Sequence, residues 1–376
     1  MTDLPAAVLV LGSGAGALSC ATEFAQQGVE VTVADSERFR TNVDAITESG
    51  GVRLRSPWHG ITTAPARGSL DPAGEIAGAA VIVVCVPAFG HDSVAALLAD
   101  NLTDGTQVIF AGEGGGCLAL GAALARVARP ARIEMAELNS LPYGTRVRAP
   151  GLITASRKAG GTVVAGIPAR PDNRAVATAC ALWQSVSPVQ NVLETVLLNF
   201  NAIDHVPPIL CNLGAIDTAG AGKFLLWGTG AGPAVCRIIA EVDAELIAIR
   251  RELGFTDLRG YAEFLVAQGF AAQLGQDLHA TLQSSAFADS TFGTGPAALE
   301  SRYVTEDVPY ALCLMSSIGA RLEVPTPTID SLITLIGIAA GRDFRAAGRT
   351  LATFGLGELT RDELLAATTN GWWQPQ

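Results

Sequence analysis

One histidine stands in a polar stretch of an otherwise apolar region. The stretch reads Asn199-Phe-Asn201-Ala-Ile-Asp204-His205-Val-Pro207-Pro208, and Asn212 follows it. A histidine titrates near neutral pH and can pass a proton while a hydride moves, and the prolines stiffen the chain around it. His205 is therefore a candidate general acid or base, although a structural histidine with a satisfied ring fits the same pattern.

A second polar stretch, Ser301-Arg302-Tyr303-Val-Thr305-Glu306-Asp307, brings a guanidinium and two carboxylates together. Arg302 could grip a carboxylate in a two-pronged fork, and Asp307 could orient an imidazole and stabilise its charge. The same residues also suit the start of a helix, where Thr305 caps and the acids fill the first turn. If that helix is rotated, Glu306 rather than Asp307 would face His205.

A glycine loop lies near the start of the chain, where Gly12-Ser13-Gly14-Ala15-Gly16-Ala17 reads as G-x-G-x-x-A. An apolar run from Ala6 to Leu11 precedes it, helical character follows from Leu18 to Gln27, and a second apolar run ends at Asp35. Small residues at this spacing let the backbone approach a pyrophosphate at a helix N-terminus. The arrangement predicts dinucleotide binding, and the lack of a second adenine-nucleotide fingerprint argues against a flavin.

The residues after the second strand leave the choice of nicotinamide cofactor open. Asp35 would accept a hydrogen bond from a ribose 2′-hydroxyl and repel a 2′-phosphate, which favours NAD(H). Arg38 and Arg40 lie just beyond it and could instead clamp that phosphate, which favours NADP(H). We expect NAD(H) or NADP(H), and we lean to NAD(H).

Further apolar runs extend the expected parallel sheet. Ala79 to Val86 reads as a buried strand, and Val86 and Pro87 would then border the cofactor crevice. His91 is expected in the loop that follows, before a helix over 93–99. Later strands are expected over 107–111, 133–137 and 162–165, and the glycines of 112–116 could bring the backbone close to substrate.

The second half of the chain has a helical period. Residues 233–253 place apolar side chains three and four apart, with Pro233 in the first turn and Gly254 after the end. Similar patterns cover 258–267, 306–320 and 329–340. The sequence therefore predicts an α/β protein with a doubly wound parallel sheet over 1–188 and an all-helical domain over 189–376, with the substrate cleft between them.

The amino-acid composition indicates which class of molecule the protein binds. The 376 residues carry 25 Lys and Arg against 36 Asp and Glu, a net charge of −11, which argues against nucleic acid and favours small molecules. Seven scattered cysteines form no metal-binding or disulfide pattern, which fits a reduced cytoplasm. Neither a signal peptide nor a membrane-spanning run is visible. The apolar helices could cover a homodimer interface.

Taken in order, these residues resemble the opine dehydrogenase family, which includes octopine and nopaline dehydrogenase-like enzymes. The resemblance covers nearly the whole chain. It includes the glycine loop, Glu137-Leu-Asn139-Ser-Leu-Pro-Tyr143, the His205 and Asp307 stretches, and a C-terminal segment over 356–365. The glycine motif is shared by many folds, so the two stretches around His205 and Asp307 are the specific part.

The resemblance implies a Rossmann-type N-terminal domain and NAD(P)H-dependent reduction of the imine formed between an amino group and a 2-oxo acid. The product would be an N-(carboxyalkyl) amino acid, which is a secondary amine. His205 and Asp307 would form the acid/base pair, and Arg302 would hold the oxo-acid carboxylate. Asn201, Asn139 and Tyr143 are expected to bind or border the substrate.

The residues alone leave two other functions possible. A 2-hydroxy-acid or ketopantoate-type dehydrogenase would use a lysine as its acid, and Lys223 is the only lysine of the second half, without the asparagine that such sites pair with it. A non-catalytic NAD(H)-binding sensor would have no need of an acid/base pair such as His205 and Asp307.

Overall fold

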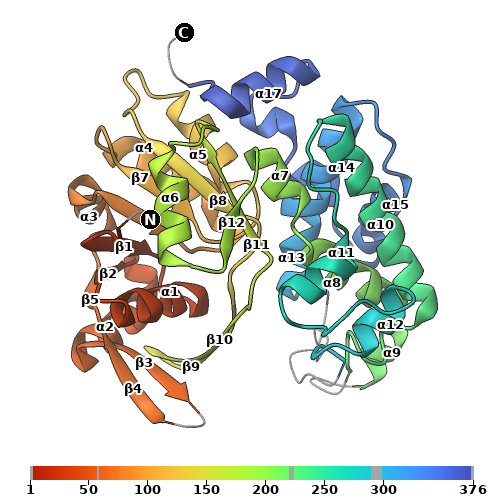
Figure 1. Cartoon of the computed structure of the whole chain (residues 1–376), viewed down its shortest axis with the longest axis horizontal. Helices are drawn as coiled ribbons and strands as arrows, with labels where there is room; N and C mark the ends of the chain where they lie inside the picture. The colour runs from red at the N-terminus through yellow and green to blue at the C-terminus, as the bar shows by residue number, and fades with distance from the viewer. Residues whose placement is uncertain (1–2, 57–58, 220–223, 289–298, 374–376) are drawn as a thin grey trace. The chain divides into compact units, whose positions relative to one another are not determined.

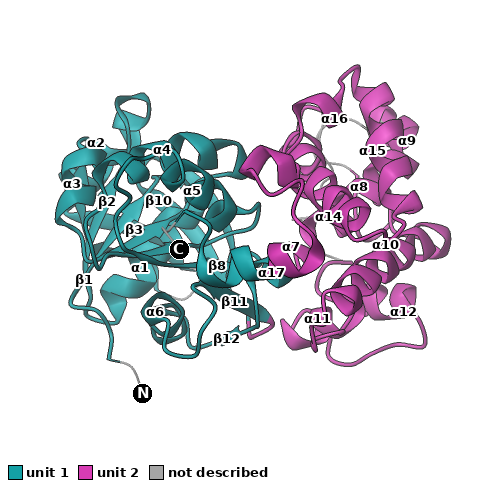
Figure 2. Ribbon diagram, turned by 90° about the horizontal axis from the view of Figure 1, so that it is seen from above, with its two compact units in different colours: residues 1–158, 162–195, 366–376 teal, residues 159–161, 196–365 magenta. Residues whose placement is uncertain are grey.

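The computed structural model describes the chain except for residues 1–2, 57–58, 220–223, 289–298 and 374–376 (Figure 1). The chain forms two compact units, which Figure 2 colours separately. Unit 1 comprises Met1–Lys158, Thr162–Thr195 and Ala366–Gln376, and unit 2 comprises Ala159–Gly161 and Val196–Leu365. Where the sequence predicts one boundary after residue 188, the chain stays in unit 1 to Thr195, apart from Ala159–Gly161, and returns to it at Ala366.

Unit 1 is built on an eight-stranded sheet in the order β12-β11-β8-β7-β6-β1-β2-β5. Every neighbouring pair is parallel except β8 with β11, which is antiparallel. The strands are β1 (Ala7–Leu11), β2 (Glu30–Ala34), β5 (Arg67–Ser69), β6 (Val81–Val84), β7 (Gln107–Phe110), β8 (Glu134–Leu138), β11 (Thr162–Ile167) and β12 (Val186–Pro188). The order reverses at β1, and in such sheets ligands bind outside the carboxyl ends of the strands at that point. The predicted doubly wound sheet is confirmed.

Helices cover both faces of this sheet. α1 (Ala15–Gln26) and α6 (Arg174–Leu182) share one hydrophobic core on one face. α3 (Pro72–Gly78), α4 (His91–Asn101) and α5 (Gly116–Leu124) lie together on the other face, as Figure 2 shows.

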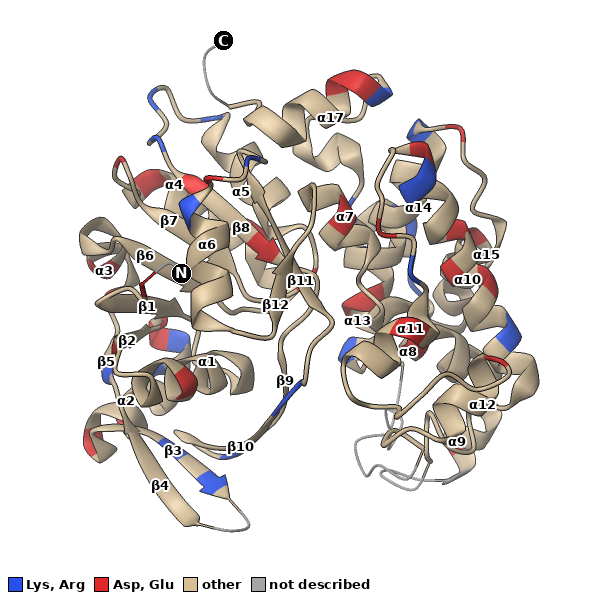
Figure 3. Cartoon of the chain, in the orientation of Figure 1, with Lys and Arg blue, Asp and Glu red and all other residues tan. Residues whose placement is uncertain are grey.

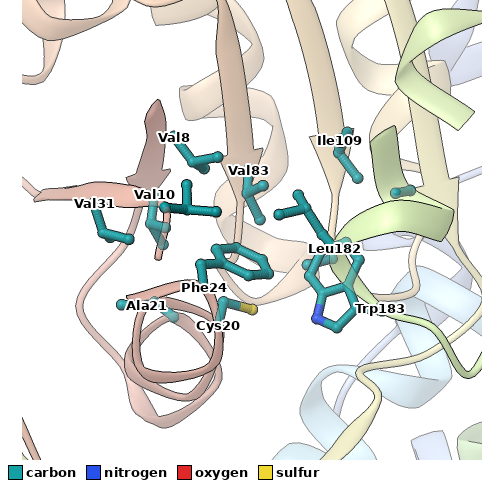
Figure 4. Close-up of a cluster of buried hydrophobic side chains, with 14 of the residues drawn as sticks. Val8, Val10, Cys20, Ala21, Phe24, Val31, Val83, Ile109, Leu182 and Trp183 are labelled. Carbon is teal, nitrogen blue, oxygen red and sulfur yellow. The ribbon is translucent and has the colours of Figure 1, made fainter. Parts of the chain in front are cut away.

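One aromatic pair is central to the core under α1. Phe24 and Trp183 meet edge to face with ring centroids 5.1 Å apart, among side chains of β1, β2 and β6 (Figure 4). Burying a side chain of this size contributes about 1.5–3 kcal/mol. This packing fixes α1, and with it the glycine loop that precedes the helix.

A second sheet in unit 1 was not predicted. Its four strands run in the order β4-β3-β10-β9, as two hairpins joined by the parallel pair β3 and β10. The strands are β3 (Gly51–Ser56), β4 (Gly60–Pro65), β9 (Tyr143–Ala149) and β10 (Leu152–Arg157). Arginine positions mark β3, β9 and β10 in Figure 3. Charged side chains on such short strands discourage edge-to-edge pairing with other molecules.

Unit 2 is helical, as predicted. Its elements are α8 (Asn201–Cys211), α9 (Leu213–Ala219), α10 (Pro233–Glu252), α11 (Tyr261–Ala267), α12 (Leu278–Gln283), α13 (Arg302–Thr305), a π-helical turn η4 (Val308–Leu312), α14 (Cys313–Arg321), α15 (Pro327–Ala340) and α16 (Phe344–Ala347). The long helix over 233–253 is confirmed as α10. The helix expected over 306–320 is instead interrupted, because the chain passes through the π-helical turn before α14 begins.

The described residues form three further helices: α2 (Arg40–Ser49) in unit 1, and α7 (Val192–Leu197) and α17 (Arg361–Asn370), where the chain passes between the units. Short 3-10 turns lie at Glu37–Phe39 (η1), Ala88–Gly90 (η2) and Leu351–Phe354 (η5). Among the described residues, no helix has the length and apolar character needed to cross a membrane.

Candidate active site

The glycine loop joins β1 to α1 and leaves the start of the helix open. Gly12 has a φ of +107°, and a Cβ there would lie 2.6 Å from the Cys85 carbonyl oxygen. A Cβ on Gly14 would meet no atom of the described residues within 4 Å. In the described part of the chain no side chain caps α1, whose first turn holds Ala15 and Gly16 and no acid. Open N–H groups beside open space fit the pyrophosphate of a dinucleotide.

Asp35 follows β2 directly, and its carboxylate is held from two sides. The Ser13 hydroxyl donates to Oδ2 at 2.7 Å, and the Ser36 N–H donates to Oδ1 at 2.8 Å. Asn42 in α2 holds Ser13 in turn, because its amide donates to the Ser13 carbonyl at 3.1 Å. Exposed Arg38 lies over the Phe39 ring, 5.6 Å from its centroid. The expected ribose-binding acid is thus tied to the glycine loop.

Val86 and Pro87 follow β6 at the same edge of the sheet. A Cβ on Gly12 would lie 3.1 Å from the Val86 side chain, which places Val86 against the loop. Pro87 precedes the 3-10 turn η2. Gly16 has no room for a side chain either, because its Cβ would lie 2.8 Å from the Cys85 sulfur. The glycine positions therefore allow the close packing of α1 on β6 that this fold requires.

One expectation for the loops of unit 1 was wrong, and another stays a prediction. His91 is not in a loop facing the cofactor: it is the first residue of α4, is buried, and packs edge to face on Phe110 with centroids 5.4 Å apart. In the glycine loop over 112–116, the Glu137 carboxylate accepts the N–H groups of Gly115 at 2.8 Å and Cys117 at 2.9 Å. A protein carboxylate therefore binds the start of α5, and the approach of the loop over 112–116 to substrate stays a prediction.

Tyr143 and Asn139 are both buried within unit 1. The Tyr143 hydroxyl donates to Glu23 Oε2 at 2.6 Å and accepts the Trp183 indole N–H at 2.7 Å. Asn139 lies at the end of β8, where its Oδ1 accepts the Val163 N–H at 2.9 Å. These contacts join α1 to Trp183 through Tyr143 and β8 to β11 through Asn139, and the contact of either residue with substrate stays a prediction.

The prolines expected to stiffen the chain beside His205 lie inside a helix. Pro207 and Pro208 occupy the middle of α8, and each lacks the N–H that would bond to the carbonyl four residues earlier. For Pro208 that carbonyl belongs to Asp204, and the Trp227 indole N–H donates to it at 3.2 Å. Trp227 therefore compensates one of the two hydrogen bonds that the prolines remove, and it anchors the helix at the residue before His205.

The structure brings His205 and Asp307 together in unit 2, although they are 102 residues apart in the chain. His205 Nδ1 donates to Asp307 Oδ2 at 2.7 Å, and both side chains are buried. Asp307 directly precedes the π-helical turn η4, an irregularity that recurs at functional sites. With Nδ1 held by a carboxylate, Nε2 is the nitrogen that can exchange a proton with a substrate.

The acid next to Asp307 has a different partner. Glu306 is buried and accepts a hydrogen bond from Arg302 Nε one helical turn earlier, while the Arg302 side chain stays 63% exposed. This contact settles which acid faces the imidazole: Asp307 does, and Glu306 holds the guanidinium. The alternative in which Thr305 caps a helix and the acids fill its first turn does not hold, because Thr305 is the last residue of α13 and the Asp307 side chain makes no cap hydrogen bond to η4.

Tyr303 and Asn201 complete the surroundings of the imidazole. The Tyr303 ring stacks on the His205 ring, with centroids 3.9 Å apart and planes 20° from parallel. Asn201 begins α8, one turn before His205, and its N–H donates to Asn199 Oδ1. Sequence reasoning gave Tyr303 no role, although its place beside Arg302 was visible.

A further carboxylate near His205 was also missed. Asp204 Oδ1 lies 3.6 Å from His205 Nε2, and Asp204 Oδ2 accepts the Tyr261 hydroxyl at 2.7 Å. Burial raises the pKa of Tyr261 well above its usual range, and the nearby Asp204 charge adds to this shift. Asp243, on α10, accepts the Tyr261 N–H at 2.7 Å, and burial raises its pKa to about 6. The only sequence signal for Asp204 was its place beside the histidine.

Lys223, the alternative acid, lies outside the described residues. No group of metal-ligating side chains that could hold an ion occurs among the residues that the structure describes.

Comparison with known proteins gives a consistent result. The family model for the alpha-helical domain of NAD/NADP octopine/nopaline dehydrogenase matches residues 188–340, and the ketopantoate reductase PanE/ApbA model matches residues 8–128. An opine dehydrogenase of Arthrobacter sp. (strain 1C) is 30% identical over 354 residues, which is 93% of this chain and 95% of that protein.

Solved structures show the same fold. Octopine dehydrogenase in complex with NADH and agmatine aligns with a TM-score of 0.78 at 20% identity, over 97% of this chain and 98% of that one. Yersinopine dehydrogenase with NADP⁺ bound aligns with a TM-score of 0.69 at 18% identity, over 99% of both chains. The chain therefore belongs to the opine dehydrogenase family of NAD(P)-dependent oxidoreductases that act on CH–NH groups.

Proposed function

We propose that this enzyme reduces the imine formed between an amino acid or amine and a 2-oxo acid, and releases an N-(carboxyalkyl) amino acid. One observation carries the proposal: a buried imidazole is held by a carboxylate, His205 with Asp307 at 2.7 Å, and the short helix α13 just before Asp307 carries an exposed guanidinium, Arg302, and packs on α8. Forming an imine needs a proton to be moved at oxygen and nitrogen, and a 2-oxo acid always brings a carboxylate.

His205 moves the protons. Its Nε2 first takes a proton from the attacking amine and then returns one to the hydroxyl that leaves as water. Asp307 keeps the proton on Nδ1 and stabilises the imidazolium while it exists, as the acid does in other His–Asp pairs. Stacking on Tyr303 fixes the ring plane, so Nε2 keeps one direction throughout.

Arg302 holds the oxo-acid carboxylate. Glu306 accepts from its Nε and thereby orients the planar guanidinium, whose exposed edge can take both carboxylate oxygens. Asn201, at the start of the helix that carries His205, offers an amide to the same substrate. The partner amine is left open by these residues.

The dinucleotide belongs to unit 1, where the open start of α1 and the space beside Gly14 suit its pyrophosphate. When bound in reduced form, it supplies the hydride that reduces the imine. We propose that NAD(H) is preferred over NADP(H), because the Asp35 carboxylate is held in place by Ser13 and would repel a 2′-phosphate.

A substrate-omission assay tests the proposal. Purified protein is mixed with NADH or NADPH, a panel of 2-oxo acids, and a panel of amino acids and simple amines, and the loss of reduced nicotinamide is followed by absorbance. We expect oxidation that requires both the oxo acid and the amine and is faster with NADH. Oxidation with the oxo acid alone would identify a hydroxy-acid dehydrogenase, and cofactor binding without turnover would identify a sensor.

A further inference from the structure

Two carboxylates, not one, flank the imidazole of His205. Asp307 Oδ2 lies 2.7 Å from Nδ1, and Asp204 Oδ1 lies 3.6 Å from Nε2. The longer distance exceeds that of a good hydrogen bond. A substrate atom bonded to Nε2 therefore comes to lie beside Asp204 Oδ1 as well, so Asp204 faces the reacting side of the ring and Asp307 the supporting side.

Asp204 is held firmly in this position. The Tyr261 hydroxyl donates to its Oδ2, and the Trp227 indole N–H donates to its carbonyl. Both Tyr261 and Trp227 are almost fully buried, and Asp204 itself is 5% exposed. A carboxylate fixed by neighbours on other segments cannot simply turn to solvent, so its charge acts on whatever group occupies the space next to Nε2.

The proposed reaction creates a positive charge at that place. When the carbinolamine loses water, the proton on His205 Nε2 goes to the hydroxyl oxygen and the C–O bond breaks. The lone pair on nitrogen forms the C=N bond, so the imidazole ends neutral and the nitrogen ends as a cationic iminium. The charge of the imidazolium is thus transferred to the substrate nitrogen within the same few ångströms.

We propose that Asp204 is a second catalytic carboxylate, whose Oδ1 pairs with the substrate nitrogen as it becomes cationic during loss of water. This inference rests on the proposed function and adds a residue to it. Asp307 supports the imidazole, whereas Asp204 acts on the substrate. A carboxylate at this distance in a buried site stabilises the iminium far more than the neutral carbinolamine, which accelerates its formation.

A pair of ligands that differ in one group tests the proposal by binding alone. The probes are 2,2′-iminodipropanoic acid, whose nitrogen is cationic at neutral pH, and 2,2′-oxydipropanoic acid, in which an uncharged ether oxygen replaces that nitrogen. Affinities are measured by calorimetry with the oxidised dinucleotide present, for wild type and for Asp204→Asn. We expect the substitution to lower the affinity for the amine by about 10- to 100-fold and the affinity for the ether by less than about twofold.

Two further variants separate charge from structure. Tyr261→Phe keeps the Asp204 carboxylate but removes the hydrogen bond that holds it. The affinity for the amine should therefore fall less than in Asp204→Asn. Asp243→Asn removes another buried carboxylate that also touches Tyr261 but does not face His205, so both affinities should stay as in wild type. Dinucleotide binding and thermal unfolding of each variant show whether the fold is intact.

The outcomes are distinct. A fall in affinity for the amine alone in Asp204→Asn supports the proposal. A matching fall in turnover with an unchanged dinucleotide affinity supports it further. Equal loss of both ligands would show that Asp204 only shapes the site, and unchanged affinities would show that it does not touch the nitrogen; either result overturns the inference. If wild type binds neither diacid, the inference fails, while the substrate-omission assay decides separately whether the proposed function holds.

Discussion

Asp307 Oδ2 lies 2.7 Å from His205 Nδ1, so the acid of one polar stretch holds the imidazole of another stretch 102 residues earlier. The contact fixes which ring nitrogen remains for the substrate. It also separates the tasks of two neighbouring acids, because Glu306 is engaged by Arg302.

Replacing His205 by Asn should lower kcat for reductive amination by about 100- to 10,000-fold, because the proton moved at Nε2 has no other carrier. Asp307→Asn keeps the shape but not the charge, so it should lower kcat less than the loss of the imidazole does. Steady-state rates and dinucleotide affinity check both variants. A His205→Asn enzyme with near wild-type turnover would remove the imidazole from the mechanism.

Replacing Arg302 by Lys should raise KM for the 2-oxo acid by about 10- to 100-fold, because a point charge cannot take both carboxylate oxygens. KM for the amine should change little. The matched control is Glu306→Gln, which leaves the guanidinium but loosens it, and which should raise the same KM by a smaller factor. A change confined to the amine KM would mean that Arg302 binds the other substrate.

Replacing Asp35 by Ser should shift the preference toward NADPH, with the ratio of kcat/KM for NADPH over NADH rising by about 10- to 100-fold. The reason is that the acid held by Ser13 opposes a 2′-phosphate, while Arg38 nearby can then attract it. Ser13→Ala keeps the acid but frees it, and should shift the ratio in the same direction by less. An unchanged ratio in Asp35→Ser would place cofactor choice elsewhere.

Asp243 should make the protein less stable as the pH rises. Its pKa is raised from 3.8 to about 6 by burial, so the folded state keeps a proton that the unfolded state releases. The resulting stabilisation is fully present below about pH 4 and is lost as the pH rises through about 6, with a limit of about 3 kcal/mol.

Denaturant unfolding of wild type and Asp243→Asn across this pH range measures the effect as a difference. The variant carries no titrating group at this position, so its stability relative to wild type should increase with pH by about 2 kcal/mol. A difference that stays constant with pH would show that the folded protein does not raise this pKa.

Tyr143→Phe should lower stability by about 1–2 kcal/mol, because the buried Trp183 N–H and the Glu23 carboxylate both lose a partner. KM for either substrate should not change. Thermal unfolding together with steady-state kinetics checks this; unaltered stability with a raised KM would instead favour the substrate contact that the resemblance implies for Tyr143.

Elements with one strong local signal could be predicted from the sequence. The continuous apolar runs around Val8 and Val83 mark strands buried on both faces, and the glycine loop between strand and helix marks the dinucleotide site. Helix α10 is visible because its apolar residues keep a helical period over twenty residues. In each case the pattern lies within one segment, so the element can be predicted without knowing which distant residues it contacts.

Features that depend on distant partners were missed. Pro207 and Pro208 locally disfavour a helix, because they remove backbone N–H groups. The Trp227 indole N–H, which is distant in the sequence, compensates one of the lost hydrogen bonds in α8. The glycines over 112–116 suggest an open loop until Glu137 is seen to bind there. The second sheet has no continuous apolar run, since its strands carry exposed arginines and threonines.

The most direct measurement of the central claim follows the atoms of the reaction. The enzyme is given a 2-oxo acid, an amine labelled with heavy nitrogen, and NADH carrying deuterium at the transferred position, and the product is analysed by mass spectrometry. We predict a secondary amine that contains both labels, with deuterium on the former carbonyl carbon. A deuterated 2-hydroxy acid without heavy nitrogen would contradict the account.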